Sequence, residues 1–333
     1  MLLLCNYYIT YRCNAFCGFC HFADHRRYKN SIDAKLEDFK SNVHQLAELG
    51  VKFIDLTGGE PLLNKHIASM AKFARINKMR TSITTNTLLY NKYAVLLAGN
   101  VNLLHFSLDS PDEEEHNRIR KIDSYKSVFT SIELAKSIGE FPDILFTVTN
   151  NTYNKLPRML EIARKYDLVL IVNPVFSYFG NPGLSAKALD FIEEFVEGKP
   201  DIYMNDAYIK LRKDGGNDVK DPKCKAVSRV IVISPNNKIL LPCYHFANKA
   251  VRIDKPIKEI RFTNELKYYK AMEGKFNFCS GCTINCYFEP SFAFPTNIYS
   301  LKSIPSKIKY SYQKLIKQKI KKKVSSKFFG VNN

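Results

Sequence analysis

Three cysteines near the start of the chain have the type and spacing of metal ligands. Cys13, Cys17 and Cys20 are spaced C-x3-C-x2-C and directly follow an apolar run. Thiolates are soft ligands that favour iron–sulfur clusters and zinc. Three thiolates on one short loop can hold three corners of a cubane and leave its remaining iron open to a non-protein ligand. A structural zinc ion would take a fourth protein ligand, for which His21 or His25 is available, so the spacing alone leaves both metals open.

A second group of cysteines lies in the C-terminal part of the chain. Its members are Cys224, Cys243, Cys279, Cys282 and Cys286. The first two flank "RVIVISPNNKILLPC", two apolar runs around a Pro-Asn-Asn turn that predict a β-hairpin. Clustered cysteines in a chain without an export signal indicate metal binding rather than a disulfide framework. We expect a second metal site here, with zinc as the alternative to an iron–sulfur cluster, and we expect the isolated Cys5 to be a small buried side chain.

Strand and helix patterns alternate along the first 200 residues and would position these ligands. The predicted strands are 2–10, 51–57, 80–85, 101–108, 143–149 and 168–176, and the predicted helices are 31–50, 65–78, 92–99, 125–139, 156–166 and 185–198. Such a series predicts parallel strands joined by helical crossovers. The strands lack a polar alternation, which predicts burial on both faces as in a barrel. Periodicity alone does not separate a barrel from an open doubly wound sheet.

Polar residues that could take part in binding or catalysis recur where the predicted strands end. They are Gly58, Gly59 and Glu60 after the second strand, Asn86 after the third, and Ser107 and Asp109 at the end of the fourth. Each group alone would be read as a turn rich in Gly, Asn and Asp. In parallel β–α barrels, however, the carboxyl ends of the strands carry the active site. Together with the cysteine loop after the first strand, these residues predict one site at that end.

With these motifs the chain resembles the radical SAM superfamily. The resemblance rests on C-x3-C-x2-C with Phe19 before its last cysteine, on "GGEP", and on "SLDS", in the expected order within roughly residues 1–200. It implies an α/β fold, a partial (β/α)6 TIM-type barrel, with a [4Fe–4S] cluster whose open iron binds S-adenosylmethionine. It also implies a one-electron donor such as flavodoxin or ferredoxin. In this family, reductive cleavage of S-adenosylmethionine gives a 5′-deoxyadenosyl radical that abstracts hydrogen from the substrate.

The resemblance assigns roles to individual residues. Cys13, Cys17 and Cys20 would bind the cluster, and the Gly58-Gly59-Glu60 segment would meet the methionine amino group, a task that suits a carboxylate. Ser107 and Asp109 would lie near the ribose or the methionine end, and Asn86 near the cofactor, although the family's "TTN" usually continues with Gly and this chain has Thr87. "EEHNRIR" resembles the family's "HDxxR", which makes Arg120 a candidate for the methionine carboxylate. The alternative for Arg120 is a solvated helix charge.

The second cysteine group resembles a shortened SPASM or twitch domain, which implies a second, auxiliary [4Fe–4S] cluster. Two departures stand out: Lys238 occupies the family's glycine position before Cys243, and five cysteines are fewer than a full SPASM domain carries. We therefore divide the chain into a radical SAM barrel over 1–210, a small cysteine-rich domain with a β-hairpin over 211–295, and a basic helical tail over 296–333.

The tail is strongly basic. It holds ten lysines between Lys302 and Lys327, so the net charge of +18 falls to about +8 without them. Residues 305–329 have an apolar helical face made of Ile308, Tyr312, Leu315, Ile316, Ile320, Val324 and Phe328. Such a helix could dock on the body with its lysines in solvent, lie on an anionic membrane surface, or bind a nucleic acid backbone. Because no apolar run is long enough to span a bilayer, we expect a cytoplasmic protein that could be peripheral to the membrane.

Two classes of function follow. The first is a radical SAM enzyme whose unidentified substrate is a peptide or protein, or a lipid or isoprenoid. A GTP-cyclising role is a further option, although such enzymes end in Gly-Gly and this chain ends in "FFGVNN". The second class is a non-catalytic iron–sulfur or zinc protein that binds nucleic acid through its basic tail.

Overall fold

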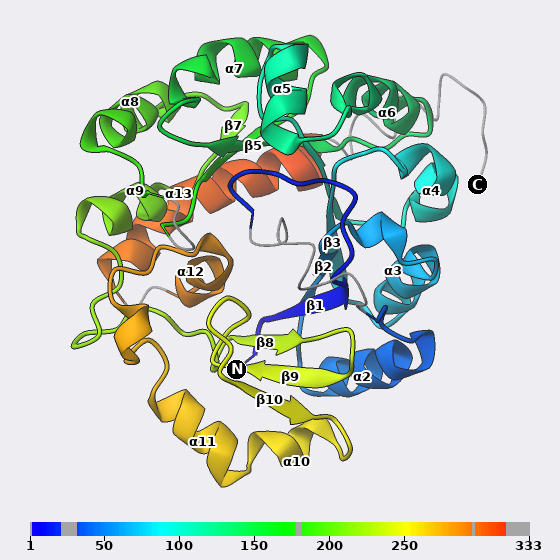
Figure 1. Cartoon of the computed structure of the whole chain (residues 1–333), viewed down its shortest axis with the longest axis vertical. Helices are drawn as coiled ribbons and strands as arrows, with labels where there is room; N and C mark the ends of the chain where they lie inside the picture. Colours follow the sequence, from blue (N-terminus) through cyan, green and yellow to red (C-terminus); the bar gives the residue numbers. More distant parts are fainter. Residues whose placement is uncertain (1, 21–31, 178–181, 295–296, 318–333) are drawn as a thin grey trace.

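The computed structural model describes residues 2–20, 32–177, 182–294 and 297–317 and shows a curved, mostly parallel sheet surrounded by helices (Figure 1). The ten-stranded sheet has the order β10-β9-β8-β1-β2-β3-β4-β5-β6-β7. The first seven strands are β1 Leu4–Thr10, β2 Phe53–Gly58, β3 Arg80–Thr85, β4 Leu103–Ser107, β5 Asp143–Val148, β6 Leu170–Pro174 and β7 Ile202–Tyr203. They pair in parallel with their neighbours in chain order, which confirms the partial barrel.

Helices follow the strands and cover the outside of the sheet (Figure 1). In the first part of the chain they are α2 Leu36–Glu48, α3 Ile67–Ile76, α4 Tyr90–Leu97, α5 Glu113–Arg120, α6 Tyr125–Ser137, α7 Leu156–Lys165, α8 Ala186–Val196 and α9 Asp206–Lys213. Short 3-10 turns lie at Pro61–Leu63, Tyr153–Lys155 and Asn277–Cys279. Every predicted strand and helix overlaps an observed one. The charged α5, which the apolar periodicity did not predict, is an addition.

Side chains alternate between two environments along the strands. Outward residues pack against the helices, as Tyr7 does against Phe39 at 4.9 Å between ring centroids, and Cys5 is fully buried in the same layer, as predicted. Inward residues of β2, such as Asp55 and Thr57, are only half-buried. The expectation of burial on both faces is therefore wrong for β2, whose central residues alternate between buried and half-buried.

The predicted hairpin is present and continues the same sheet. β8 (Val230–Ile233) pairs in parallel with β1, and β9 (Lys238–Leu241) and β10 (Lys249–Arg252) follow in antiparallel order. α10 Ile257–Arg261, α11 Asn264–Ala271 and α12 Asn285–Ser291 complete this part of the chain. The cysteine-rich segment thus shares hydrogen bonds with the first barrel strand, while the boundary drawn at residue 211 remains a prediction.

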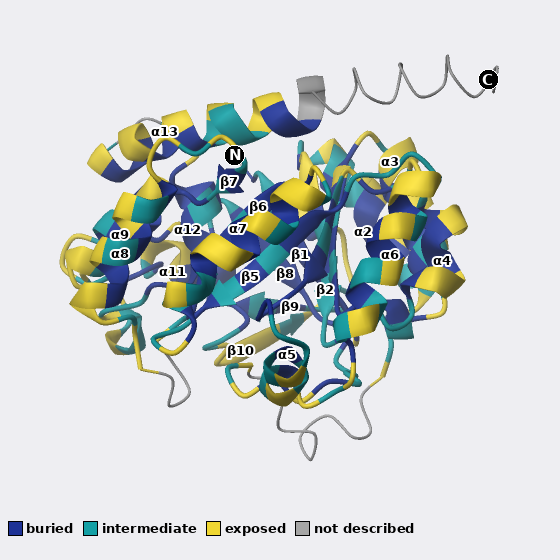
Figure 2. Ribbon diagram, turned by 90° about the horizontal axis from the view of Figure 1, so that it is seen from above, coloured by how far each residue is buried: buried dark blue, intermediate teal, exposed yellow. Residues whose placement is uncertain are grey.

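The tail begins with α13 (Ile298–Ser311), which runs into a π-helical turn over Tyr312–Lys317. It lies at the opposite end of the barrel from α5 (Figure 2). Asp143, at the start of β5, accepts a hydrogen bond from Tyr310 Oη at 2.6 Å and one from Lys314 Nζ at 2.8 Å. This end is the amino-terminal end of the strands.

Three lysines of this helix and the turn after it, Lys307, Lys309 and Lys314, face the barrel. Lys307 Nζ donates to the Phe292 carbonyl at 3.0 Å and Lys309 Nζ to the Lys199 carbonyl at 2.9 Å. The predicted docking on the body is confirmed, but the expectation of a solvated lysine face is wrong for Lys307, Lys309 and Lys314. The reason is that a buried carboxylate and free carbonyl groups at the base of the barrel need donors. Ile320, Val324 and Phe328 lie outside the described residues.

Candidate cluster and cofactor site

The cysteine loop follows β1 and is tied to the end of α5. Phe16 N donates to the Arg120 carbonyl at 3.0 Å and Gly18 N to the Ile119 carbonyl at 3.2 Å. Within the loop, Cys20 N donates to the Cys17 carbonyl at 3.0 Å, and Ala15 N to Cys13 Sγ at 3.4 Å. Burial raises the pKa of Cys13, and the charges of Glu60, Cys17 and Cys20 add to that rise.

Two glycines allow the end of β2 to pack directly on this loop. A Cβ on Gly58, whose φ is +152°, would lie 2.0 Å from the Thr10 carbonyl oxygen. A Cβ on Gly59 would lie 2.2 Å from the Arg12 carbonyl oxygen and 2.8 Å from Cys13 Cβ. Any side chain at these positions would push β2 away from the cysteine loop.

Glu60 connects three of the predicted motifs. Its side chain is 2% exposed and accepts hydrogen bonds from Thr85 Oγ1 at 2.8 Å and from Asn86 N at 2.8 Å. Asn86 Nδ2 in turn donates to Asn14 Oδ1, in the cysteine loop, at 2.6 Å. Burial raises the pKa of Glu60, and these hydrogen bonds oppose that rise. The "GGEP" and "TTN" motifs therefore meet the cysteine loop, as the sequence predicted.

Thr87, which stands where the family usually has Gly, keeps a glycine-like backbone. Its φ is +73°, and its side chain is buried. Thr87 N donates to Thr85 Oγ1 at 3.0 Å and Thr87 Oγ1 to Ser127 Oγ at 3.0 Å. A β-branched residue is strained in this region, so local hydrogen bonds preserve the turn that holds Asn86 against the loop.

Arg120 and Asp109 form a buried ion pair beside the cysteines. Arg120 Nη1 lies 2.6 Å from Asp109 Oδ2, and Asp109 Oδ1 accepts from Thr147 N at 2.9 Å. Arg120 is 8% exposed, so the alternative of a solvated helix charge is wrong; the last turn of α5 faces the cysteine loop, where Asp109 and the Cys17 thiol attract the guanidinium. Within the described residues, Arg120 Nε is buried without a hydrogen-bond partner.

His116 is a supporting residue that the sequence reasoning missed. Its Nδ1 accepts from Asp109 N at 3.1 Å, and its Nε2 lies 3.0 Å from Ser124 Oγ. Burial lowers the pKa of His116 to about 3, so the ring is neutral at neutral pH. Its position four residues before Arg120, on one helix face, was the available signal. Ser107 is buried at the end of β4, next to this network.

The thiol side chains of the cysteine loop are chemically suited to bind an iron–sulfur cluster. Burial raises the pKa of Cys13 to about 12 and that of Cys17 to about 11, so metal binding must displace protons from both thiols. In the described part of the chain, no three His, Cys, Asp or Glu side chains stand as a ready-made set of metal ligands. The fit to a cluster and its cofactor therefore rests on three features. The three cysteines share one loop, the backbone of Gly58 and Gly59 lies close to that loop, and Arg120 Nε has no partner among the described residues. His21 and His25 lie outside the described residues.

Asn217 ties the cysteine-bearing segments of the second group together. Its side chain accepts from Cys224 N at 3.3 Å and donates to the Cys279 carbonyl at 3.2 Å. Its backbone exchanges hydrogen bonds with Gly281 and Cys282 at 2.9 and 3.0 Å. Gly274, at φ +74°, allows close approach, since a Cβ there would lie 3.3 Å from Cys224 Cβ. Cys224 and Cys279 are thus held at neighbouring backbone positions.

The five thiols of the second group differ in the charges that shift their pKa values. Thiolates at Cys243, Cys279 and Cys282 each contribute to raising the pKa of Cys224. Peptide N–H groups of Ala226, Phe246 and Ile284 oppose these rises at Cys224, Cys243 and Cys282. The pKa of Cys286, in the first turn of α12, is raised chiefly by desolvation and then by the charge of Asp55 on the inner face of β2. Cys286 is solvent-exposed, whereas Cys224 and Cys243 are buried.

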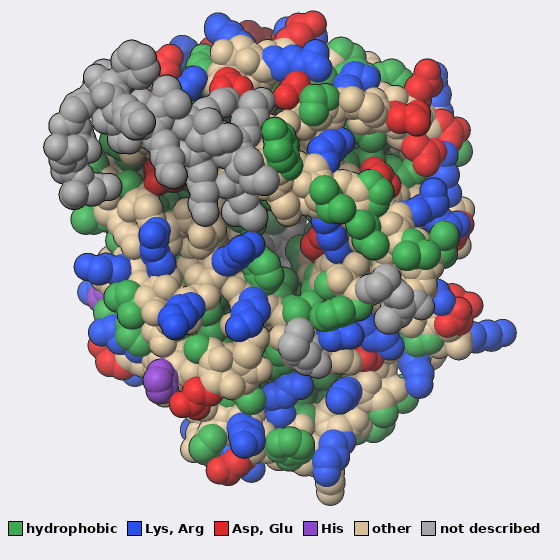
Figure 3. Space-filling model, turned by 180° about the vertical axis from the view of Figure 1, so that it is seen from behind, with side chains coloured by type: hydrophobic (Ala, Val, Ile, Leu, Met, Phe, Trp, Pro, Cys, Tyr) green, Lys and Arg blue, Asp and Glu red, His purple; other side chains and the backbone are tan. Residues whose placement is uncertain are grey.

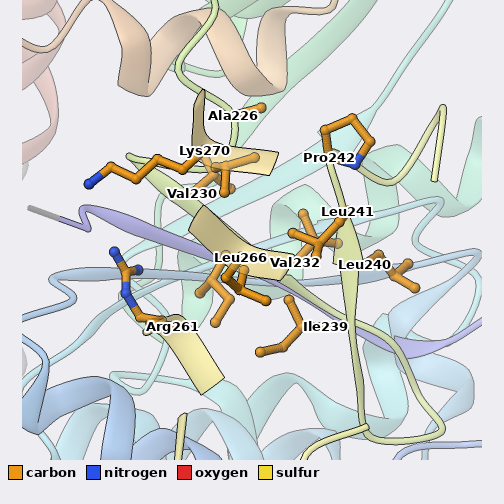
Figure 4. A pocket seen from close by; sticks show the side chains of 12 residues that line it. Ala226, Val230, Val232, Ile239, Leu240, Leu241, Pro242, Arg261, Leu266 and Lys270 are labelled. Carbon is orange, nitrogen blue, oxygen red and sulfur yellow. The ribbon is translucent and has the colours of Figure 1, made fainter. Parts of the chain in front are cut away.

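Two cavities lie away from the cysteine loop. One, of about 30 Å³, is lined by Val230, Ile239 and Leu266 beneath the hairpin (Figure 4). It has room for about one water molecule and is a packing gap. The other, of about 680 Å³, is a surface groove between α2 and the segment before α10, with Asn42 and Lys258 among its lining residues. Neither contains a residue of the predicted site.

Comparison with known proteins gives matches to one superfamily. Residues 7–163 match the Radical SAM superfamily. A protein named "Probable GTP 3′,8-cyclase" from Methanococcus maripaludis strain C7 is 31% identical over 170 residues, which are 49% of this chain and 56% of that protein. The GTP 3′,8-cyclase of Peptoclostridium acidaminophilum is 32% identical over 153 residues, 44% of this chain and 46% of that protein. This chain spans 55–56% of the length of the first three curated relatives it matches.

Solved structures share the fold. Native anSMEcpe with bound AdoMet has a TM-score of 0.64 at 20% identity, covering 95% of this chain and 99% of that chain. Streptococcus suis SuiB bound to the precursor peptide SuiA has a TM-score of 0.63 at 16% identity, covering 87% of this chain and 71% of that chain. Residues 7–163 are therefore a radical SAM superfamily domain, which this chain extends with a cysteine-rich segment and a basic tail.

Proposed function

We propose that this protein is a radical SAM enzyme that uses a [4Fe–4S] cluster on Cys13, Cys17 and Cys20. The observation that carries the proposal is the convergence of three strand ends on the cysteine loop. Glu60 reaches the loop through Asn86, and Arg120 reaches it through the end of α5. The radical SAM domain itself implies a [4Fe–4S] cluster and S-adenosylmethionine.

The chain's own residues would bind and orient the cofactor. Once bound, the cluster and S-adenosylmethionine supply a 5′-deoxyadenosyl radical for hydrogen abstraction. Arg120 offers its unpartnered Nε to the methionine carboxylate, and Asp109 holds the guanidinium in place while being fixed by Thr147 N. The Gly58-Gly59-Glu60 segment lies against Cys13, where it would meet the methionine amino group.

The inner face of the barrel favours a polar substrate. It carries Asp55, whose Oδ1 accepts from Ser82 Oγ at 2.6 Å, and Asn173, whose Oδ1 accepts from Asn285 Nδ2 at 2.8 Å. Lipid or isoprenoid chains gain nothing from such a surface, whereas a peptide segment can exchange hydrogen bonds with it. We infer that the substrate is a peptide or protein. GTP, the substrate that the relatives' names suggest, is the second candidate.

We further propose that an auxiliary [4Fe–4S] cluster lies on Cys224, Cys243, Cys279 and Cys282. Asn217 brings their segments together, and peptide N–H groups point to three of their sulfurs. Such N–H donors stabilise thiolates that ligate a metal. Cys286 is the thiol left over, since it is exposed and the thiol charges that act on Cys224 come from Cys282, Cys243 and Cys279.

The first experiment is to measure iron and sulfide per chain after anaerobic reconstitution, together with 5′-deoxyadenosine formed from S-adenosylmethionine under dithionite. Wild type should hold about eight irons and form 5′-deoxyadenosine. The Cys13→Ala/Cys17→Ala/Cys20→Ala variant should hold about four irons and form none. Cys5→Ala, which removes a buried thiol of the helix layer, is the matched control and should keep both properties.

The outcomes separate the hypotheses. Zinc in place of iron, or no S-adenosylmethionine cleavage by reconstituted wild type, would reject the enzyme in favour of a non-catalytic metal protein that binds nucleic acid. About four irons in wild type and none in the triple variant would leave the second group to zinc. Cys286→Ser should keep all the iron, whereas Cys282→Ser should lose part of it. Flavodoxin or ferredoxin can then replace dithionite as the electron donor.

A further inference from the structure

The outer face of α13 carries an uncovered apolar stripe. Its side chains recur every three or four residues, so they share one helix face. They are Ile298, 50% exposed, Leu301, 53%, Ile304, 40%, Ile308, 65%, and Tyr312, 55%. Figure 3 looks onto this end of the molecule and shows hydrophobic side chains among lysines and arginines. A contiguous exposed patch of this kind marks an interaction surface.

The helix is fixed in this orientation by its polar face. Ser300, Ser303 and Ser306 are buried against the body. Lys314 and Tyr310 are anchored to the buried Asp143. An ordinary surface helix buries its apolar face, and this one does the opposite, because the barrel base offers a carboxylate and carbonyls rather than an apolar groove. Among the described residues, therefore, none covers the apolar stripe, which is open to an external partner.

The segment that carries the stripe has charges of one sign, while the acidic Asp206 of α9 lies near Lys302 and Lys309. After Glu289 the chain has no Asp or Glu, and Lys302 lies exposed between Leu301 and Ile304. An apolar stripe bordered by lysines complements a surface with an apolar interior and anionic head groups. A second copy of the chain would place two lysine-rich tails against each other. A nucleic acid backbone would leave the stripe uncovered, and Lys307, Lys309 and Lys314 are already bound to the barrel.

We propose that the outer face of α13 docks this protein on an anionic lipid surface. The apolar stripe enters the boundary between head groups and acyl chains, and the exposed Lys302 beside it faces the phosphates. No helix in the described ranges is long and apolar enough to cross a bilayer, so the contact is peripheral. This inference is independent of the proposed chemistry.

The orientation has a consequence for the active site. α13 covers the end of the barrel where β5 begins, and the cysteine loop with α5 lies at the opposite end (Figure 2). Docking would therefore turn the barrel mouth toward the aqueous side. A substrate would enter from there, so bound vesicles should leave S-adenosylmethionine cleavage unchanged.

The test is co-sedimentation of the full chain with phosphatidylcholine vesicles, with and without phosphatidylglycerol. Wild type should pellet only with the anionic vesicles, and less so at high salt. Leu301→Ser/Ile304→Ser/Ile308→Ser should weaken the partition coefficient by about tenfold or more. Val95→Ser/Leu96→Ser is the matched control, since these side chains of α4 are 73% and 59% exposed elsewhere on the surface. It should pellet like wild type.

Equal pelleting of wild type and the α13 variant would overturn the proposal, as would equal pelleting with neutral vesicles. A wild-type dimer that the variant turns into a monomer, without vesicle binding, would assign the stripe to a second copy instead. Far-UV circular dichroism of each variant confirms folding, because the three substituted side chains are exposed. A vesicle-binding protein that cleaves no S-adenosylmethionine would sustain this inference while rejecting the enzyme.

Discussion

The barrel contains a buried cation–carboxylate pair at each end, and the two differ in what they leave unpaired. At the base, Lys314 Nζ donates to Asp143 Oδ1 at 2.8 Å and to the Phe141 carbonyl at 2.7 Å, while Tyr310 binds the other carboxylate oxygen. At the mouth, Arg120 Nη1 donates to Asp109 at 2.6 Å, but its Nε has no partner among the described residues.

We interpret the base pair as structural and the mouth pair as part of the proposed cofactor site. The base network uses its carboxylate to attach the tail helix to the barrel, so its value lies in stability. The mouth network holds a guanidinium beside Cys17 with a donor unused. An unsatisfied buried donor costs free energy unless a ligand meets it. We therefore expect changes at the base to affect unfolding and changes at the mouth to affect cofactor binding.

The largest effect is expected at the base. Lys314→Met leaves Asp143 buried without its cation and should lower the free energy of unfolding by about 3–5 kcal/mol. Chemical denaturation of the apoprotein measures this loss. The double variant Lys314→Met/Asp143→Asn removes both charges and should recover most of it. A loss below about 1 kcal/mol in the single variant, as in an exposed pair, would contradict a structural role.

The matching change at the mouth is Arg120→Lys. It keeps a cation for Asp109 but removes the planar guanidinium that can bind a carboxylate through two nitrogens. We expect the affinity for S-adenosylmethionine to fall roughly 10- to 100-fold, measured by calorimetry on reconstituted protein. Lys314→Arg at the base is the control and should leave that affinity unchanged. Undiminished affinity in Arg120→Lys would remove Arg120 from the cofactor site.

Asp55 provides a third case, a carboxylate at the inner barrel face with no cation beside it among the described residues. Burial raises its pKa from 3.8 to about 6. The folded state therefore binds a proton more tightly than the unfolded state, and the stability that this proton contributes is lost as pH rises from about 4 to about 6. Asp55→Asn should be more stable than wild type above that window by about 1–2 kcal/mol.

Unfolding of wild type and Asp55→Asn at several pH values tests this sign. The stability gap should widen between about pH 4 and pH 6 and stay constant above it. A gap that narrows with rising pH would mean that a cation not seen at this site stabilises the ionised carboxylate. Asp55 would then belong with the paired carboxylates at the two ends.

The sequence predicted the residues at the barrel mouth better than it predicted the burial of Arg120. Strand order and the mouth residues were predictable, because Gly59, Glu60 and Asp109 each follow an apolar strand and parallel strands end at one edge. The burial of Arg120 was not predictable, because α5 is short and highly charged and has no apolar periodicity to show which side faces inward. Its pairing depends on Asp109, which only the tertiary fold brings within reach.

The tail helix shows a second limit of prediction from sequence, because its periodicity was visible but its orientation was not. Within the described residues its periodicity predicted a helix with Ile308 and Tyr312 on one face, but not which face would dock. That choice depends on Asp143, which stands 171 positions before Lys314 and whose burial at the start of β5 the sequence does not reveal. Likewise, the local sequence could not show that Cys286 is exposed while Cys224 and Cys243 are buried.

The smallest effect concerns backbone strain at the mouth, where Thr87 has a φ of +73° beside Asn86. Thr87→Gly and Thr87→Ala both remove the hydroxyl that bonds Ser127, so their difference isolates the backbone. A residue with a Cβ is disfavoured at positive φ, and we expect the Gly variant to be the more stable by about 1 kcal/mol in denaturant unfolding. Thr84, within β3 and outside the residues with positive φ, is the control, and there Ala should be the more stable replacement. The same order at both positions would mean that Thr87 is not strained, and the conformation that holds Asn86 against the cysteine loop would then be maintained by hydrogen bonds alone.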